Sequence, residues 1–166
     1  MAWFRQSEIG ELAAEDQIEF RFVACASPDD QAIRSAVSAV SEARASLGQG
    51  AEYFVVLNDL GGSTGFTPYE GSESMSGLEA MERQGLLSVL RVPYCDSLLL
   101  EHGRAMGLDP LQVVQRADEV AAKASLDPVG ARVHKRKMVV WLKDSQAALA
   151  PLFNVEDAAP APSAAA

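Results

Sequence analysis

The chain has 166 residues, of which 48% are hydrophobic, and it carries a net charge of −9 at pH 7. This length suits one domain with a sizeable core, and the acidic balance argues against a surface that binds nucleic acid everywhere, while leaving room for a local basic face. No apolar run approaches the roughly 18–20 residues of a membrane-spanning helix, and the first residues form no apolar signal core, so we expect a cytoplasmic protein that is not held in a membrane.

The first predicted elements are a helix at Trp3–Ala14 and a strand at Ile18–Cys25, whose early alternation indicates one partly exposed face. The segment Ser27–Asp30 stops this strand and offers acids that can cap a helix. Apolar residues recur at helical spacing over Gln31–Leu47, and Gly48 is placed to end that helix.

A second strand is predicted at Tyr53–Leu57 and a third at Leu86–Val92, which stops at Pro93 because proline cannot donate to a sheet ladder. A strand, an amphipathic helix and a strand form a βαβ unit, which crosses over right-handed and makes parallel neighbours. The glycine- and serine-rich loop between the second and third strands leads into a helix near Met75–Gln84.

After the third strand the chain is predicted to be helical, with helices at Asp96–Met106, Pro110–Lys123 and Pro128–Leu149. Asp109 and Asp127 each precede a proline, which is the pattern of a helix cap followed by a first-turn proline.

These elements predict an α/β protein: a partial, Rossmann-like three-layer fold with about three parallel strands, several helices and a helical carboxyl-terminal part. Residues 1–152 are expected to form a single half-domain, and residues 153–166 a disordered tail rich in Ala and Pro. Doubly wound sheets usually have five or more strands, so the order looks like the second half of a larger domain, with an open strand edge.

The end of the second strand is the most informative site feature. Asn58 and Asp59 stand where a buried parallel strand opens into a ligand crevice, and a glycine-rich loop follows at Leu60–Pro68. The loop contains no lysine, so it is not the phosphate loop of a nucleoside triphosphatase. Cys25 and Cys95 lack metal-ligand spacing and are expected to be reduced, buried thiols.

Several segments carry a family resemblance: Tyr53-Phe-Val-Val-Leu-Asn58, Leu90-Arg-Val-Pro-Tyr-Cys-Asp-Ser97, Ala131-Arg-Val-His-Lys-Arg-Lys-Met-Val-Val-Trp-Leu142, and the opening Trp3-Phe4 with Ile9-Gly-Glu-Leu12. Over roughly residues 1–150 the chain resembles the carboxyl half of ParA/MinD-type P-loop ATPases. Its look is closest to members encoded beside plasmid mobilisation and conjugal-transfer genes.

The resemblance implies the adenine-binding end of such an ATPase. Asn58 matches the family residue that reads the adenine edge, since its amide offers a donor and an acceptor, and Pro93, Tyr94 and Asp96 match another wall of the base pocket. The family's phosphate loop and catalytic acids have no counterpart, so ATP or ADP would be held at its adenine end, and Mg²⁺ and hydrolysis would require the missing half. The implied task is plasmid mobilisation, conjugal transfer or DNA partition.

Two alternatives belong to other classes. One is a non-catalytic interaction module, derived from such an ATPase, that self-associates or binds a partner protein through its open strand edge. The other is a serine hydrolase, because Gly61–Gly65 fits G-x-S-x-G and acids and then His134 follow in the order of a triad. Gly65, Pro68 and Gly71 argue against the helix that must follow the serine of such a motif.

A basic run stands out in this acidic chain: Arg132, Lys135, Arg136 and Lys137. On a helix the first three share one face. Valines and a leucine are expected to attach this helix to a core: Val133, Val139, Val140 and Leu142. The run fits either a solvated face or a weak, salt-dependent contact with DNA phosphates or an acidic partner.

Overall fold

The computed structural model describes residues 20–60 and 62–153, so the predicted helix Trp3–Ala14 and the predicted tail from residue 154 onward lie outside the described residues. The helices and strands are β1 (Phe20–Ala26), α2 (Asp30–Leu47), β2 (Ala51–Asn58), α3 (Glu73–Arg83), β3 (Ser88–Val92), α4 (Leu98–Ala105), α5 (Pro110–Gln115), α6 (Ala117–Lys123) and α7 (Pro128–Leu149). Short 3₁₀ turns lie at η2 (Gly48–Gly50), η3 (Gly62–Thr64), η4 (Thr67–Tyr69) and η5 (Ala150–Leu152).

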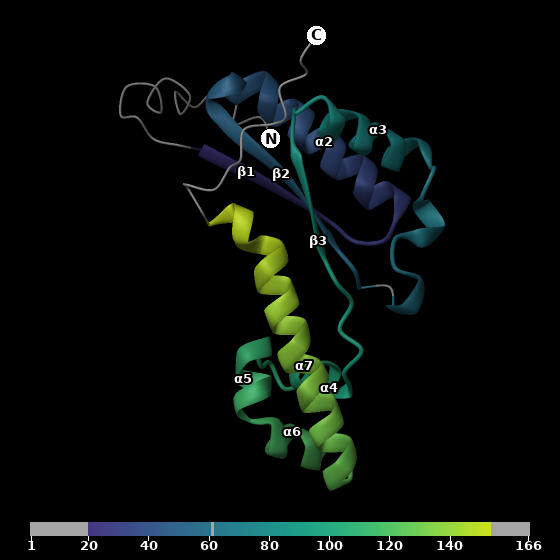
Figure 1. The fold of residues 1–166 in the computed structure, drawn as a ribbon, viewed down its shortest axis with the longest axis vertical. Coiled ribbons are helices and arrows are strands. Elements are labelled where there is room, and N and C mark those ends of the chain that lie inside the picture. Colours follow the sequence, from purple (N-terminus) through teal and green to yellow (C-terminus); the bar gives the residue numbers. More distant parts are fainter. Residues whose placement is uncertain (1–19, 61, 154–166) are drawn as a thin grey trace.

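Over residues 20–60 and 62–153 the sheet has three parallel strands in the order β1-β2-β3, which confirms the predicted α/β class with its helical carboxyl-terminal part. The pairing register runs from Phe20 opposite Ala51 in β1 and β2 to Asn58 opposite Val92 in β2 and β3. Within the described residues β1 and β3 are therefore both edge strands. The carboxyl ends of β2 and β3 lie next to each other at the same end of the sheet (Figure 1).

One face of the sheet is closed by α2 and α3. Because side chains alternate along a strand, Val55 and Leu57 point to this face and are fully buried. They pack with Ile33 of α2 and Leu78 of α3. The predicted cap is confirmed, since the Asp29 carboxylate accepts from the backbone N–H of Ala32 at 2.9 Å.

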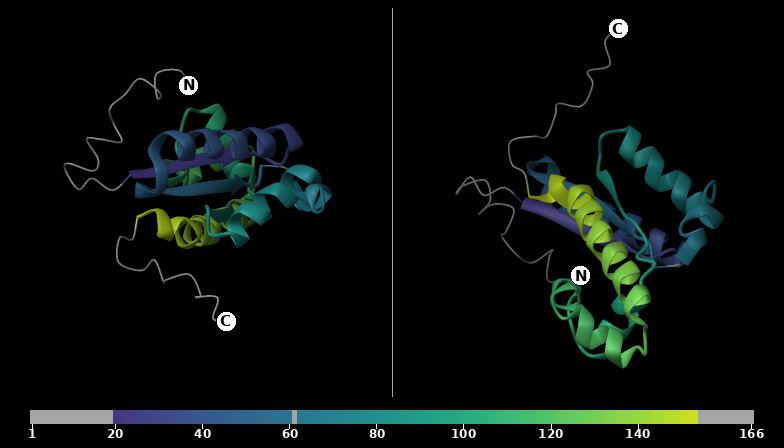
Figure 2. Two further views of the ribbon diagram at one scale, coloured as in Figure 1. Left: turned by 90° about the horizontal axis from the view of Figure 1, so that it is seen from above. Right: turned by 60° about the horizontal axis from the view of Figure 1, so that its bottom comes forward.

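Among the described residues, the other face is covered by α7 and the turn η5 after it, mainly over β2 and β3. Phe54 and Val56 of β2 lie against the carboxyl-terminal half of α7 in one cluster with Trp141, and Figure 2 shows α2 and α7 on opposite sides of the sheet. Val23 of β1, on the α7 face, is 42% exposed. Cys25 is exposed as well, so the predicted exposed face is confirmed but the predicted burial of Cys25 is wrong.

A separate helical cluster lies beyond the carboxyl ends of the strands. The helices α4, α5 and α6 pack there with the amino-terminal half of α7, which then runs back along the sheet (Figure 1). The core of this cluster contains Leu99, Val113, Val120 and Met138, all fully buried. Two cores are thus joined by one helix.

Two predicted helices differ from the structure in this region. The predicted helix Pro110–Lys123 is wrong as a single helix, because the chain bends at Arg116 (φ −104°, ψ 27°) between α5 and α6, and this bend lets both short helices face one core. The predicted start at Asp96 is two residues early. Ser97 stays extended, since its hydroxyl donates to the carbonyl of His134 at 3.1 Å.

Candidate functional site

A cavity of about 590 Å³ lies between α7 and the incompletely covered face of the sheet. Its lining comes from the α7 face of all three strands (Val23, Cys25, Val56, Asn58, Val92), the residues that follow β2 and β3 (Asp59, Leu60, Pro93, Tyr94, Cys95), the helix α4 (Leu100, Arg104), and α7 with the turn after it (Trp141, Leu142, Ser145, Gln146, Leu149, Leu152). We call this space the sheet–helix cavity. It includes the carboxyl ends of β2 and β3, where parallel sheets bind ligands.

Side chains alternate between the two faces of a strand, and this alternation determines which residue at the end of β2 points into the cavity. Phe54 and Val56 point to α7, so Asn58 does too, two residues further on and directly opposite Val92 of β3. The backbone N–H of Asp59 still donates to the carbonyl of Val92 at 3.0 Å. This bond holds the two strand ends together at the mouth of the cavity.

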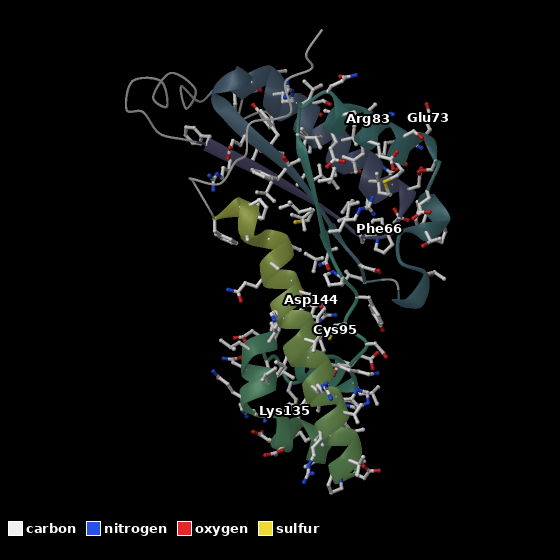
Figure 3. The ribbon with its side chains drawn as sticks, in the orientation of Figure 1. Phe66, Glu73, Arg83, Cys95, Lys135 and Asp144 are labelled. Carbon is white, nitrogen blue, oxygen red and sulfur yellow. The ribbon has the colours of Figure 1, made fainter. Side chains whose placement is uncertain are left out.

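The wall that follows β3 is tied to α7. The indole N–H of Trp141 donates to the carbonyl of Pro93 at 2.7 Å, and the thiol of Cys95 lies 3.5 Å from the sulfur of Met138. Cys95 is buried, and its burial raises the pKa of the thiol. Figure 3 shows Cys95 beside α7. The segment is therefore a fixed wall and not a free loop.

The cavity is mostly apolar, with a few polar side chains that have no partner. Among the described residues, the Asn58 amide, the Arg104 guanidinium and the Gln146 amide make no hydrogen bond or ion pair. Ser145 is 8% exposed, and its hydroxyl oxygen is buried without a hydrogen-bond partner. A buried hydroxyl without a partner costs about 1–3 kcal/mol. A few convergent polar groups in an apolar cavity of this size are typical of a small-molecule site.

The four residues that the resemblance implied for the base pocket fall into two groups. Asn58, Pro93 and Tyr94 line the sheet–helix cavity together. Asp96 does not line it, because its carboxylate pairs instead with the ammonium of Lys137 on α7 at 2.5 Å. That ammonium holds the pKa of the Asp96 carboxyl below its usual value.

A second hollow, of about 480 Å³, lies on the outer side of the same wall. Pro93, Tyr94, Cys95, Asp96, Val133, Arg136, Lys137, Val140, Trp141 and Asp144 line this α7 groove. Tyr94 is 42% exposed, Val133 49% and Val140 51%. The expectation that these valines attach α7 to a core is wrong, and Val139 is likewise 49% exposed.

The inward stripe of α7 consists of other residues. Met138 and Ser145 are buried, and Trp141 and His134 are half-buried. These positions recur at the helical spacing of three and four residues, so they form one face. The sequence signal was this mixed stripe, with Ser145 as a polar residue on an otherwise apolar face.

The basic run on α7 contains both exposed and paired side chains. Arg132, Lys135 and Arg136 are exposed on α7 and form no ion pair within the described part of the chain. Lys137 faces the α7 groove and is held by Asp96. Three of the four predicted patch residues therefore remain as an exposed cationic surface.

The described backbone does not have the geometry of a nucleophile elbow. After β2 the chain forms only the 3₁₀ turns η3 and η4, and the next α-helix begins at Glu73. The ring nitrogen Nδ1 of His134 accepts from the backbone N–H of Leu98 at 3.2 Å. The strand–turn–helix arrangement that the serine motif requires is thus missing.

Comparisons with protein-family models, with curated proteins and with solved structures found no match. Over residues 20–60 and 62–153, no helix is both long and apolar enough to cross a membrane. The described side chains also contain no group of three or more His, Cys, Asp or Glu residues that could hold a metal ion. The side chains that line the sheet–helix cavity offer hydrogen-bonding groups, one guanidinium charge, two thiols and apolar contact. Asp59 also lines the cavity, but its carboxylate lies against Gly65.

Proposed function

We propose that this chain binds the base of an adenine nucleotide, ATP or ADP, in the sheet–helix cavity. The observation that carries the proposal is the position of Asn58 at the carboxyl end of the central strand, in one cavity with Pro93 and Tyr94. An Asn amide presents one donor and one acceptor group, which match the edge of adenine. The cavity volume of about 590 Å³ lies in the range of small-molecule sites.

The apolar walls support the same proposal. Val56 and Val92 provide the sheet side of the cavity, and Trp141 and Leu142 provide the α7 side. Because Val56, Val92 and Trp141 pack together, a planar base would lie against this apolar lining, while one polar group at its edge fixes the orientation of the base. Asn58 is the group that stands at the strand end of this space.

The proposed role is binding without hydrolysis by this chain alone. Phosphoryl transfer requires a phosphate loop, its lysine and a metal ion together, and the resemblance assigns these to the half of the family fold that has no counterpart in this sequence. Mg²⁺ would act only with that half supplied. The wider role in plasmid mobilisation, conjugal transfer or DNA partition, in the cytoplasm, rests on the resemblance alone.

Titration calorimetry with ADP and ATP tests the proposal. We expect saturable binding, and a loss of roughly tenfold in affinity for Asn58→Ala, because two neutral hydrogen bonds contribute about 0.5–1.5 kcal/mol each. Gln115→Ala is the matched control, since this amide is exposed on α5 and does not line the cavity. No saturable binding, or equal affinity in the Asn58 variant, would contradict the proposal.

A second candidate function is protein interaction, by self-association or with a partner protein. It is favoured by the exposed apolar side chains of the α7 groove and by the two edge strands of the described sheet. Light scattering across a concentration series measures the self-association. A substitution of Val133 by Lys should abolish dimers that form through the groove, and unchanged dimers would assign the contact elsewhere.

The exposed cations of α7 carry a further, weaker proposal of DNA contact. A patch of three free cations binds duplex DNA mainly through counterion release, with a dissociation constant on the order of 10⁻⁴–10⁻⁶ M at physiological salt. The net charge of −9 places the expected affinity at the weak end. Replacing Lys135 and Arg136 by Gln should remove most of the binding in a low-salt titration.

A further inference from the structure

Among the described residues, one cation in the wall of the sheet–helix cavity has no ion-pair partner. Arg104 lies in the last turn of α4, and within the described residues its guanidinium forms no ion pair. The described ion pairs use other cations, namely Arg21, Arg34, Arg116 and Lys137. A guanidinium offers a planar fork of donors that matches phosphate oxygens, which makes an unpaired Arg in a cavity wall a candidate anion anchor.

The polar groups of the cavity wall indicate which end of a ligand would be negative. The uncharged Asn58 lines the cavity at the end of β2, whereas Arg104 lines it from α4. The Asp59 carboxylate lies against Gly65 in the loop after β2. An anionic group would therefore be attracted to the Arg104 end. A ligand with a neutral polar base and a negative tail has this polarity.

A second and independent observation comes from Ser145 on α7. Its hydroxyl is buried, points to no partner among the described residues, and belongs to the lining of the same cavity. Buried hydroxyl groups in folded proteins nearly always have a partner. The next residue, Gln146, also lines the cavity with an uncommitted amide, so the α7 wall offers hydrogen bonds to a polar, hydroxyl-bearing part of a ligand.

Resting on the proposed function, we infer that the ligand is a nucleotide and not a nucleoside. Its phosphate binds the guanidinium of Arg104, and its ribose hydroxyl groups bind Ser145. Three of the uncommitted groups would then bind one part of the ligand each: Asn58 the base, Ser145 the sugar and Arg104 the phosphate. The anion is held by a side chain from the helical cluster, far along the chain from the loop after β2.

Calorimetry with adenosine, AMP and ADP separates the phosphate from the base. We expect AMP and ADP to bind at least about tenfold more tightly than adenosine, because a charge-assisted bidentate contact is stronger than a neutral one. Arg104→Gln should reduce the affinity for AMP to that for adenosine and leave adenosine binding unchanged. Inorganic phosphate should compete with AMP and not with adenosine.

The matched control is Arg83→Gln. Arg83 also lies in the last turn of a helix, α3 (Figure 3), and it is not among the residues that line the cavity. We expect unchanged binding of AMP and adenosine in this variant. Ser145→Ala should weaken adenosine and AMP by the same severalfold factor, since the sugar is common to both.

The reactivity of Cys25 provides a second measurement of binding that is independent of calorimetry. Its thiol is exposed and lines the cavity, so saturating AMP should slow its alkylation by iodoacetamide in the unsubstituted chain. In Arg104→Gln this protection should require the higher concentration that adenosine requires.

The outcomes distinguish the two proposals. If adenosine binds as tightly as AMP, or if Arg104→Gln weakens adenosine and AMP equally, the anion anchor is wrong while the adenine site stands. If phosphate and AMP bind but Asn58→Ala changes nothing, the base assignment is wrong while the anchor stands. If none of the ligands binds or protects Cys25, both are wrong.

Discussion

The two faces of the sheet are built from the same strands but reach different degrees of closure. On the α2 face, Val55 and Leu57 are fully buried. On the α7 face, two residues in β1 remain open, with Val23 42% exposed and Cys25 exposed. The closed face holds the fold together, and the incompletely covered face has room for a ligand beside the strand ends. Because the α2 face supplies the buried core of the sheet, the α7 face can carry polar side chains that have no partner.

The difference follows from how the covering helices are connected. The crossover helix α2 connects β1 to β2, and it packs closely on the two strands that it joins. The helix α7 instead begins in the helical cluster, where Met138 is fully buried, and reaches the sheet only with its second half. Within the described residues, α7 packs on β2 and β3 and leaves Val23 of β1 partly exposed.

The largest expected contrast is in stability. Val55→Ala removes a fully buried side chain from the closed face and should lower the free energy of unfolding by about 2 kcal/mol, from lost burial and the cavity left behind. Val23→Ala makes the same chemical change on the open face, where the side chain is 42% exposed, and should cost under about 0.5 kcal/mol. Urea unfolding measures both. Equal losses would show that the α7 face is as closed as the α2 face.

The next contrast is between two thiols that line the same cavity. Burial raises the pKa of Cys95, which disfavours its reactive thiolate, whereas Cys25 is exposed. We expect Cys25 to react with a disulfide reagent at neutral pH at least about tenfold faster than Cys95. Cys25→Ser should remove the fast phase and leave the slow one. A fast phase that survives in this variant would place Cys95 in contact with solvent.

A smaller effect is expected at Ser145, where the substitution by Ala should weaken ligand binding but raise the stability of the ligand-free chain. In the absence of ligand, Ser145→Ala removes a buried hydroxyl without a partner and improves helix propensity, so it should raise the free energy of unfolding by about 0.5 kcal/mol. Ser41→Ala on α2 is the control, because the Ser41 hydroxyl is exposed and donates to the carbonyl of Val37. A loss of stability in Ser145→Ala would mean that this hydroxyl is satisfied in the folded chain.

The sequence predicts much of this architecture because the signals are local. The strands end where Asn58 and Pro93 stand, and the acid–proline pairs mark helix starts, with Asp109 and Asp127 both accepting from the expected backbone N–H groups. The bend at Arg116 has no such marker, since neither glycine nor proline stands there. It is imposed by packing against one core.

The residues of the candidate site also differ in whether a local sequence signal predicts them. Asn58 could be identified from a strand end alone. Arg104 and Ser145 could not, because each reaches the cavity only through the way α4 and α7 pack against the rest of the chain. The valines of α7 were misassigned since apolar residues lie on both sides of this helix, and only the tertiary structure shows that Met138 faces inward and Val140 outward.

The smallest expected effect concerns two carboxyl groups, one on α2 and one in the segment between β3 and α4. The pKa of Asp30 on α2 is lowered, first by the hydroxyl of Ser74 on α3. The pKa of Asp96 is lowered, first by the ammonium of Lys137 on α7. In both cases the folded pKa lies below the unfolded value, so the stabilisation is present above about pH 4 and is lost as the pH falls through the folded value.

Salt should separate the two carboxyl groups. The contact of Asp96 with Lys137 is an exposed ion pair, which salt screens, whereas the leading contact of Asp30 is with a neutral hydroxyl. In an NMR titration, we expect added salt to raise the pKa of Asp96 toward its usual value and to change that of Asp30 less. Lys137→Gln should remove the salt dependence at Asp96 alone. If salt moves the pKa of both carboxyls equally, Asp30 is controlled by the charge of Arg34 and not by the bond that joins the two helices of the closed face.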